Sequence, residues 1–207
     1  YKSRVRIIEA TRFLVSFLEV KMKQLPLLEK DAVQDQACKE KWESYPFDLA
    51  LFHGWAHAPD EFVTYTAFNR TVWTDQEGGM PLLLKELAVV HTGVLCKSSY
   101  EWGNHGAGFV RRGGAQEKVD ALVAGECQSD FFDATEKLVL QYTTEMVVDS
   151  RPTEDTLTAM ADVFTSKQIM QLTFAIGAYI LNSLTANLCG LEIGDDKKYN
   201  ANKEIHK

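Results

Sequence analysis

Apolar residues recur at intervals of three and four along most of the chain, and this spacing constrains the fold more than any other sequence feature. The longest such pattern lies near the C-terminus, at Ile169, Leu172, Ile176, Ile180 and Leu184. Residues at this spacing share one face of an α-helix, which has 3.6 residues per turn. Alternating Val/Ile-rich runs bounded by Asn-Gly turns, which mark strands, are not found. The sequence therefore predicts an all-α protein, a helical bundle.

Helix boundaries are indicated by prolines, glycines and capping motifs. Ser98 with Glu101, and Thr165 with Gln168, each match the S/T-x-x-E/Q capping box that opens a helix. One helix is expected to carry Phe131 on the same face as residues 138 and 142. Besides an N-terminal helix, helices are predicted over 46–57, from 59, 81–97, 98–112, 115–124, 130–147, from 152 and from 165.

The 207 residues are expected to form one main domain with two extensions. Residues 1–45 are predicted to be an N-terminal helix, which Pro26 must end by about Gln24, followed by a charged arm. Residues 46–194 form the helical domain, and residues 195–207 form a polar C-terminal tail. This organisation adds one helix to the N-terminal side of the bundle.

The net charge of −7 and the lack of a basic stripe argue against a nucleic-acid partner. No apolar run approaches the length of a membrane span and no signal peptide opens the chain, so we expect no membrane partner and a cytoplasmic location. Because the first residue is Tyr, a processed and secreted form is also consistent with the sequence. The four cysteines lack metal-site spacing, which favours reduced thiols and no metal.

The richest concentration of ionisable side chains lies between Glu86 and His105. It comprises Glu86, His91, Tyr100, Glu101 and His105. Glu101 and His105 are four residues apart, which places carboxylate and imidazole on one helix face. Glu86 has apolar neighbours in the chain, so a buried Glu86 must be paired or protonated. A chain reversal near residues 97 and 98 would bring it back towards His105.

Each of these residues also has a structural explanation without function. Glu101 fits the capping box, Glu86 suits the positive end of a helix dipole, and His91 suits a packed core or interface. His53 and His57 have the spacing of a helical metal pair, but a third ligand is missing nearby. The sequence alone leaves these alternatives open.

Two stretches, Lys85 to Val90 and Ser99 to His105, resemble the carboxymuconolactone decarboxylase family, which includes the alkyl hydroperoxidase D proteins. The second stretch carries the variant Tyr-Glu-Trp-x-x-His. The segments 56–59 and 182–190 are also similar, so the resemblance covers about residues 46 to 194. The resemblance implies an all-helical bundle that assembles as a homo-oligomer, a dimer, trimer or hexamer.

The family's peroxidases are expected to carry a glutamate, a Cys-x-x-Cys pair and a histidine. Glu86 and His105 match this pattern, whereas the cysteine positions hold Ser98 and Glu101. The resemblance therefore implies acid-base chemistry without a metal or organic cofactor, on a small organic acid, lactone or related metabolite.

In this mechanism His105 shuttles a proton and is oriented by Glu86 or Glu101. Tyr100 would polarise a substrate oxygen. Trp102, His91 and Ser98 are expected to contact the small-molecule substrate.

Three hypotheses follow from these residues. A decarboxylase, lyase or isomerase predicts that Glu86, Glu101 and His105 converge on an enclosed pocket. A non-catalytic binding or assembly protein predicts that the same side chains are paired off or face solvent. A thiol peroxidase would require a second thiol beside Cys96.

Overall fold

The computed structural model describes residues 24–200, and these residues form helices and loops without a strand. The N-terminal helix expected before Gln24 lies outside the described residues. In chain order the elements are η1 (Lys30–Ala32), α2 (Gln36–Glu43), α3 (Ala50–Trp55), α4 (Pro59–Val72), α5 (Leu82–Leu95), α6 (Ser99–Arg111), α7 (Gln116–Val123), α8 (Ala134–Val148), α9 (Glu154–Val163), α10 (Ser166–Cys189) and α11 (Asp196–Asn200). The prediction of an all-α bundle is confirmed.

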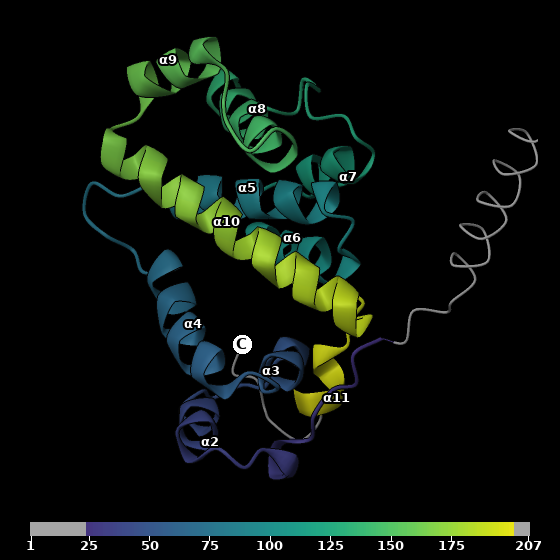
Figure 1. The fold of residues 1–207 in the computed structure, drawn as a ribbon. Helices are drawn as coiled ribbons and strands as arrows, with labels where there is room; N and C mark the ends of the chain where they lie inside the picture. The colour runs from purple at the N-terminus through teal and green to yellow at the C-terminus, as the bar shows by residue number, and fades with distance from the viewer. Residues whose placement is uncertain (1–23, 201–207) are drawn as a thin grey trace, which may run out of the picture.

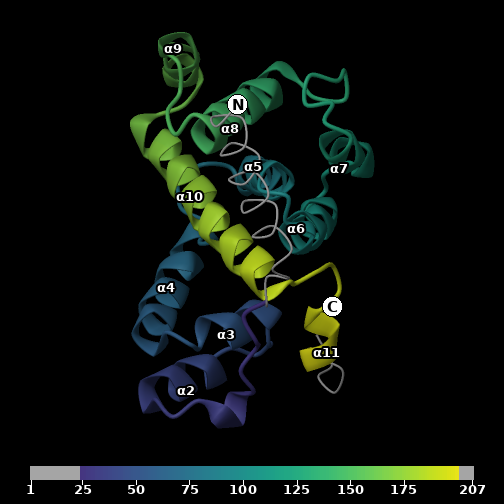
Figure 2. The ribbon, with the colours of Figure 1, turned by 45° about the vertical axis from the view of Figure 1, so that its right-hand side comes forward.

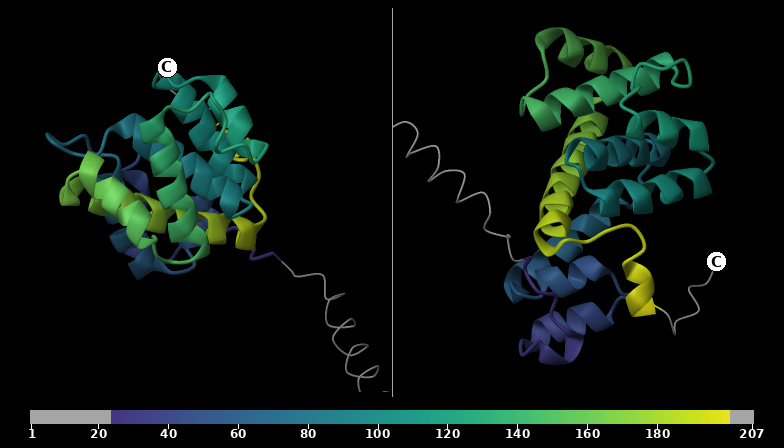
Figure 3. Two further views of the ribbon diagram at one scale, coloured as in Figure 1. Left: turned by 90° about the horizontal axis from the view of Figure 1, so that it is seen from above. Right: turned by 90° about the vertical axis from the view of Figure 1, so that its right-hand side faces the viewer.

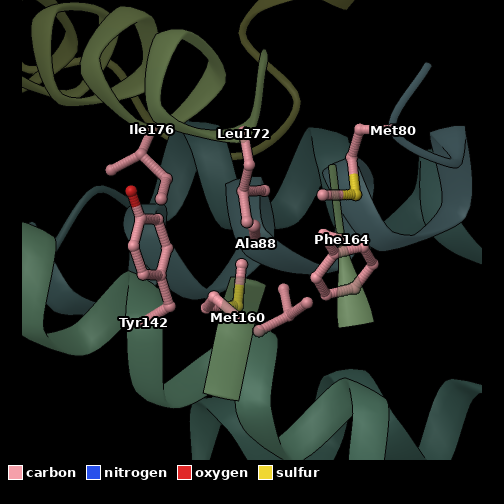
Figure 4. Packing of buried hydrophobic residues seen from close by; sticks show 8 residues of the cluster. Met80, Ala88, Tyr142, Met160, Phe164, Leu172 and Ile176 are labelled. Carbon is pink, nitrogen blue, oxygen red and sulfur yellow. The ribbon is translucent and has the colours of Figure 1, made fainter. Parts of the chain in front are cut away.

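Helix α10 runs diagonally across the molecule and joins its two ends (Figure 1). It packs against α5 and α8 on one side and against α3 and α4 on the other. A cluster of buried apolar side chains fills the space between α5, α8, α9 and α10, with Leu172 and Ile176 facing Ala88, Tyr142 and Met160 (Figure 4). This core holds α10 and α5 in fixed positions.

A second group of helices, α2, α3 and α4, forms the opposite end of the molecule (Figures 1 and 2). Val33, Cys38 and Trp42 are buried here against Phe52 and Phe62. Residues 33–42, expected to belong to a charged arm, therefore contribute apolar side chains to a packed layer.

Helix α11 lies within the segment expected to be a polar tail. It sits beside α3 (Figure 3), where Tyr199 stacks on His53 with ring centroids 3.7 Å apart. Asn200 accepts a hydrogen bond from the Asp48 backbone N–H at 2.9 Å. These contacts fasten residues 196–200 to the body of the protein.

Two predicted helices have boundaries that differ in the structure, while one capping box is confirmed. The helix expected over 46–57 is confined to Ala50–Trp55. The helix expected from residue 130 begins at Ala134, because Asp133 caps it through the Glu136 backbone N–H at 2.8 Å. Phe131 therefore precedes this helix and is exposed rather than on a helical face. The capping box of Thr165 opens α10 as predicted.

The apolar stripe predicted on α10 leaves the core at its C-terminal end, because Leu184 is 60% exposed. Each four-residue step advances about 400° around a helix, so repeated steps rotate a stripe by about 40° each. Leu172 and Ile176 are buried, whereas Leu184 has rotated to the surface. By length and composition alone α10 could span a membrane; in the structure it is a partly buried core helix.

Candidate active site

A cavity of about 400 Å³ lies where α3, α4, α6, α10 and α11 meet. This volume falls within the range of small-molecule sites. Seven of the lining residues are aromatic, and eight are polar or charged. The wall includes Tyr45, Trp55, Arg70, Trp73, Tyr100, Glu101, Asn104, His105, Tyr179, Asn182 and Asp196.

Helices α5 and α6 form a tight pair that brings Glu86 to His105. The chain reverses at Lys97, which has a φ of 55°. At Gly93 the helices approach so closely that an added Cβ would lie 2.7 Å from the backbone nitrogen of Trp102. Nδ1 of His105 consequently lies 2.8 Å from Oε2 of Glu86. The fold-back that the sequence suggested for Glu86 is present.

Glu86 is buried behind His105 and is held as a carboxylate. Arg112 donates from Nε to Oε1 of Glu86 at 3.0 Å. Burial alone would raise the pKa of Glu86, but hydrogen bonds and charge from His105 and Arg112 outweigh it and lower that pKa. Because a carboxylate only accepts hydrogen bonds, Nδ1 of His105 carries a proton and Nε2 is left for other partners.

Aromatic rings fix the plane of His105. Trp73 stacks on the imidazole with centroids 5.3 Å apart and an interplanar angle of 16°. Tyr179 meets it edge-on, with centroids 4.5 Å apart. The ring of His105 is therefore positioned by a carboxylate on one edge and by aromatic contacts around it.

Glu101 turns into the cavity and is 1% exposed. Its Oε2 lies 3.8 Å from Nε2 of His105, and its Oε1 has no hydrogen-bond partner among residues 24–200. Burial and the charge of Asp196 outweigh the opposite effect of His105 and raise the pKa of Glu101 to about 7. The carboxyl group therefore changes charge near neutral pH.

The capping box predicted for Ser98 and Glu101 is wrong. Ser98 occupies the N-cap position of α6, but its side chain makes no capping hydrogen bond. Its hydroxyl is buried without a partner in the described part of the chain. Tertiary packing has directed Glu101 away from the helix end and into the cavity, which removes the capping explanation for this residue.

Tyr100 lines the cavity, and its hydroxyl proton is already engaged. It donates to Oδ1 of Asp196 at 2.7 Å. The same carboxylate oxygen accepts the backbone N–H of Ala50 at 2.7 Å and so caps α3. Asn104 donates to Oδ2 at 3.3 Å. Tyr100 thus anchors α11 to α6 instead of presenting a free donor.

The structure places His91, Trp102 and Ser98 outside the cavity wall, contrary to the expectation that they contact substrate. His91 points towards α8, where Nε2 lies 2.8 Å from Oγ1 of Thr144. Burial lowers the pKa of His91 to about 4. Trp102 packs against the apolar cluster around Leu122. His91 and Trp102 face the core because α5 packs against α8 and α6 packs against α7.

Several cavity residues were not assigned to the site from the sequence. Trp73 follows α4, Tyr179 and Asn182 lie on α10, and Asp196 begins α11. A signal for two of them existed, because Tyr179 and Asn182 are one turn apart within an otherwise apolar helix. Trp73 and Asp196 have no comparable local pattern.

Comparison with known protein families and with curated proteins gives no match. Solved structures do match. An alkylhydroperoxidase AhpD core, an uncharacterized peroxidase-related protein from Ralstonia eutropha JMP134, has a TM-score of 0.67 at 21% identity, covering 84% of this chain and 94% of that one. A peroxidase-related protein from Silicibacter sp. TM1040 gives 0.64 at 15% identity, covering 84% and 94%. The chain has the fold of the AhpD core.

A third match to this AhpD-like fold is a cysteine-to-alanine variant of the debrominase Bmp8 in complex with 2,3,4-tribromopyrrole. Its TM-score is 0.65 at 14% identity, covering 86% of this chain and 95% of that one. The matching proteins therefore include an enzyme and two peroxidase-related proteins.

Cysteine chemistry has little support at this site. Cys96 lies outside the cavity wall. Burial and the charge of Glu101 raise the pKa of Cys96 despite an opposing hydrogen bond, which disfavours the reactive thiolate.

Proposed function

We propose that the chain is an enzyme that moves protons on a small, largely apolar carbonyl compound, as a decarboxylase, lyase or isomerase. The substrate is a small organic acid, lactone or related metabolite. The acid and base groups are its own side chains, Glu101 and His105. The AhpD-like fold, which a debrominase also has, supports an enzymatic role.

The observation that carries this proposal is the state of Glu101. Its carboxyl group is buried in an aromatic-walled cavity, and Oε1 has no hydrogen-bond partner among the described residues. With a pKa of about 7, it can accept a proton as a carboxylate and return it as an acid at neutral pH. A residue kept only for stability gains nothing from such an arrangement, since an unpaired buried carboxyl is destabilising.

His105 and Glu86 support Glu101 in different ways. Nε2 of His105 is the imidazole nitrogen nearer to Glu101, at 3.8 Å from Oε2. It can relay a proton between Glu101 and the substrate. Glu86, bonded to Nδ1 at 2.8 Å, fixes the tautomer and the ring orientation. Glu86 is thus a positioning residue.

The cavity indicates the size and character of the substrate. Its aromatic walls and volume of about 400 Å³ suit one or two small rings. Arg70 is an exposed lining residue with no ion pair in the described part of the chain. A carboxylate on the substrate would find a partner there.

The alternative functions fit these observations less well. A binding or assembly protein predicts that the acidic side chains are paired off or solvent-facing. Glu86 is paired with His105, whereas Glu101 is buried with Oε1 lacking a hydrogen-bond partner among the described residues. A thiol peroxidase needs a dithiol, whereas the two motif positions hold Ser98 and Glu101.

The test is hydrogen exchange with solvent. Small enolisable acids, lactones and cyclic ketones are incubated with the protein in D₂O, and ¹H NMR follows loss of C–H signals, isomer formation and decarboxylation. We expect at least one compound to react, with the rate lowered about 100-fold or more by Glu101→Gln and by His105→Gln.

The matched control is Glu117→Gln, an exposed residue outside the cavity on α7. It should react like the unmodified protein. Equal rates for Glu101→Gln and the unmodified protein would refute the proposal. Saturable binding of compounds without any exchange would instead support the binding-protein alternative.

A further inference from the structure

The tyrosines around the cavity differ in whether their hydroxyl proton is available. A phenol has one O–H to donate, while its oxygen can also accept. Tyr100 gives its proton to Asp196 at 2.7 Å, and Tyr45 gives its proton to the Thr66 carbonyl at 3.1 Å. Neither proton is free for a ligand.

Tyr179 has the opposite arrangement. Its hydroxyl oxygen accepts the indole N–H of Trp73 at 2.8 Å. An indole nitrogen only donates, so this bond uses the oxygen of Tyr179 and leaves its proton. Among residues 24–200, no hydrogen bond donated by the Tyr179 hydroxyl is found. An O–H that already accepts a hydrogen bond is also a stronger donor.

The position of Tyr179 places this proton beside the acid-base pair. Its ring meets the imidazole of His105 edge-on, with ring centroids 4.5 Å apart, and it lines the cavity with Glu101. Burial and the negative charges of Glu101 and Glu86 raise its pKa well above the usual value despite the Trp73 hydrogen bond. The hydroxyl therefore stays protonated.

We infer that Tyr179 is a catalytic residue, the hydrogen-bond donor to the carbonyl oxygen of an enolisable substrate whose reacting carbon faces Glu101. This inference rests on the proposed function and narrows its substrate class. The sequence led us to expect that Tyr100 polarises a substrate oxygen. We assign this role instead to Tyr179, which lies on a different helix.

The electrons balance without a further reactant. Glu101 takes the proton from the carbon beside the carbonyl, and the C–H electron pair becomes the C=C bond of the enolate. The carbonyl π pair moves to oxygen, where the O–H of Tyr179 stabilises it. For a β-keto acid, the C–C bond to the carboxylate breaks instead, and CO₂ leaves while the same oxygen gains charge.

The experiment uses 4-nitrophenolate, a planar ring whose anionic oxygen mimics an enolate, and nitrobenzene, which lacks that oxygen. Glu101→Gln serves as the background, because it imitates Glu101 after it has taken a proton. Affinities are measured by calorimetric titration at a pH where the nitrophenol is ionised. The second variant is Glu101→Gln with Tyr179→Phe.

We expect Tyr179→Phe to weaken 4-nitrophenolate binding about tenfold or more and nitrobenzene binding by less than about twofold. Tyr142→Phe is the control, since this buried tyrosine on α8 lies outside the cavity and bonds Thr173. It should leave both affinities unchanged, with circular dichroism confirming that each variant is folded.

An equal loss for both ligands, no loss for 4-nitrophenolate, or no binding of 4-nitrophenolate to Glu101→Gln would each overturn the inference. These outcomes are separate from the proposed function. If deuterium exchange depends on Glu101 but not on Tyr179, the proposed enzyme is supported and the role of Tyr179 is refuted. If no exchange is found but 4-nitrophenolate binding depends on Tyr179, the hydrogen-bond donor is supported and the proposed enzyme is refuted.

Discussion

Glu101 links the chemistry of the cavity to the stability of the protein. Its pKa in the folded protein is about 7, against an ordinary value of 4.5. Between these values the folded state keeps a proton that the unfolded state has lost, so stability falls as pH rises. Over this interval, the contribution of Glu101 lowers the free energy of unfolding by about 3 kcal/mol. We expect Glu101→Gln, relative to the unmodified protein, to gain up to this amount between pH 5 and pH 8 in urea unfolding.

His91 is expected to show the opposite pH dependence. Burial lowers its pKa from 6.5 to about 4. In this interval the unfolded state binds a proton that the folded state does not, so stability rises with pH and is lost as pH falls. Relative to the unmodified protein, His91→Gln should therefore be most favoured at pH 4 and below, by up to about 3 kcal/mol. A difference from the unmodified protein that is independent of pH would show that His91 is not buried as a neutral ring.

The two effects oppose each other over most of the same pH range. The unmodified protein should show little net slope from Glu101 and His91 between about pH 4.5 and 6.5. Each single variant should reveal the slope that the other residue contributes. Urea titrations of both variants at several pH values test this pairing directly.

At the scale of elements, the contact between α5 and α6 determines whether Glu86 reaches His105. Gly93→Ala would bring a Cβ within 2.7 Å of the α6 backbone, so the helices must separate. We expect a loss of about 1–3 kcal/mol in urea unfolding and slower hydrogen exchange on substrate.

Gly106→Ala provides the matched comparison for Gly93→Ala. The Cβ added there meets a side-chain methyl of Val119 at 2.9 Å instead of backbone. Because a side chain can shift more readily than a helix, the loss of stability should be smaller. If Gly106→Ala costs as much as Gly93→Ala, close backbone approach at Gly93 is not the decisive feature.

At the scale of the whole molecule, α10 carries an apolar face that the described residues leave uncovered. Its exposed members, spaced by four and three residues with Gly177 between them, are Met170, Phe174, Leu181, Leu184 and Leu188. This is the spacing of a helix–helix seam. A Cβ at Gly177, near the middle of α10, would meet nothing within 4 Å. Lys167 is the sole charged residue in the helix.

We expect a second copy of the chain to cover this face, since its five exposed side chains are all apolar. Leu184→Glu should convert the assembly to monomers in sedimentation experiments without loss of helicity, because Leu184 is already exposed. Val148→Glu, an exposed apolar residue on α8, is the control and should leave assembly unchanged. An unmodified protein that sediments as a monomer at high concentration would contradict this expectation.

Local sequence patterns determined most of the helices and part of the site. Helical periodicity, prolines and the Thr165 capping box located the main helices, because these signals act within a few residues. The i, i+4 spacing placed Glu101 and His105 on one face, and the fold-back near Lys97 brought Glu86 to His105.

Only the tertiary structure decided which of these side chains share a cavity and in what protonation state. Glu101 makes no capping contact and points inward, and His91 contacts α8. Tyr179 is hydrogen-bonded to Trp73, which lies 106 residues away in the chain. Periodicity specifies neighbours within one helix, whereas helix crossings specify neighbours between helices. Burial and partners, and hence pKa values and free donors, depend on those crossings.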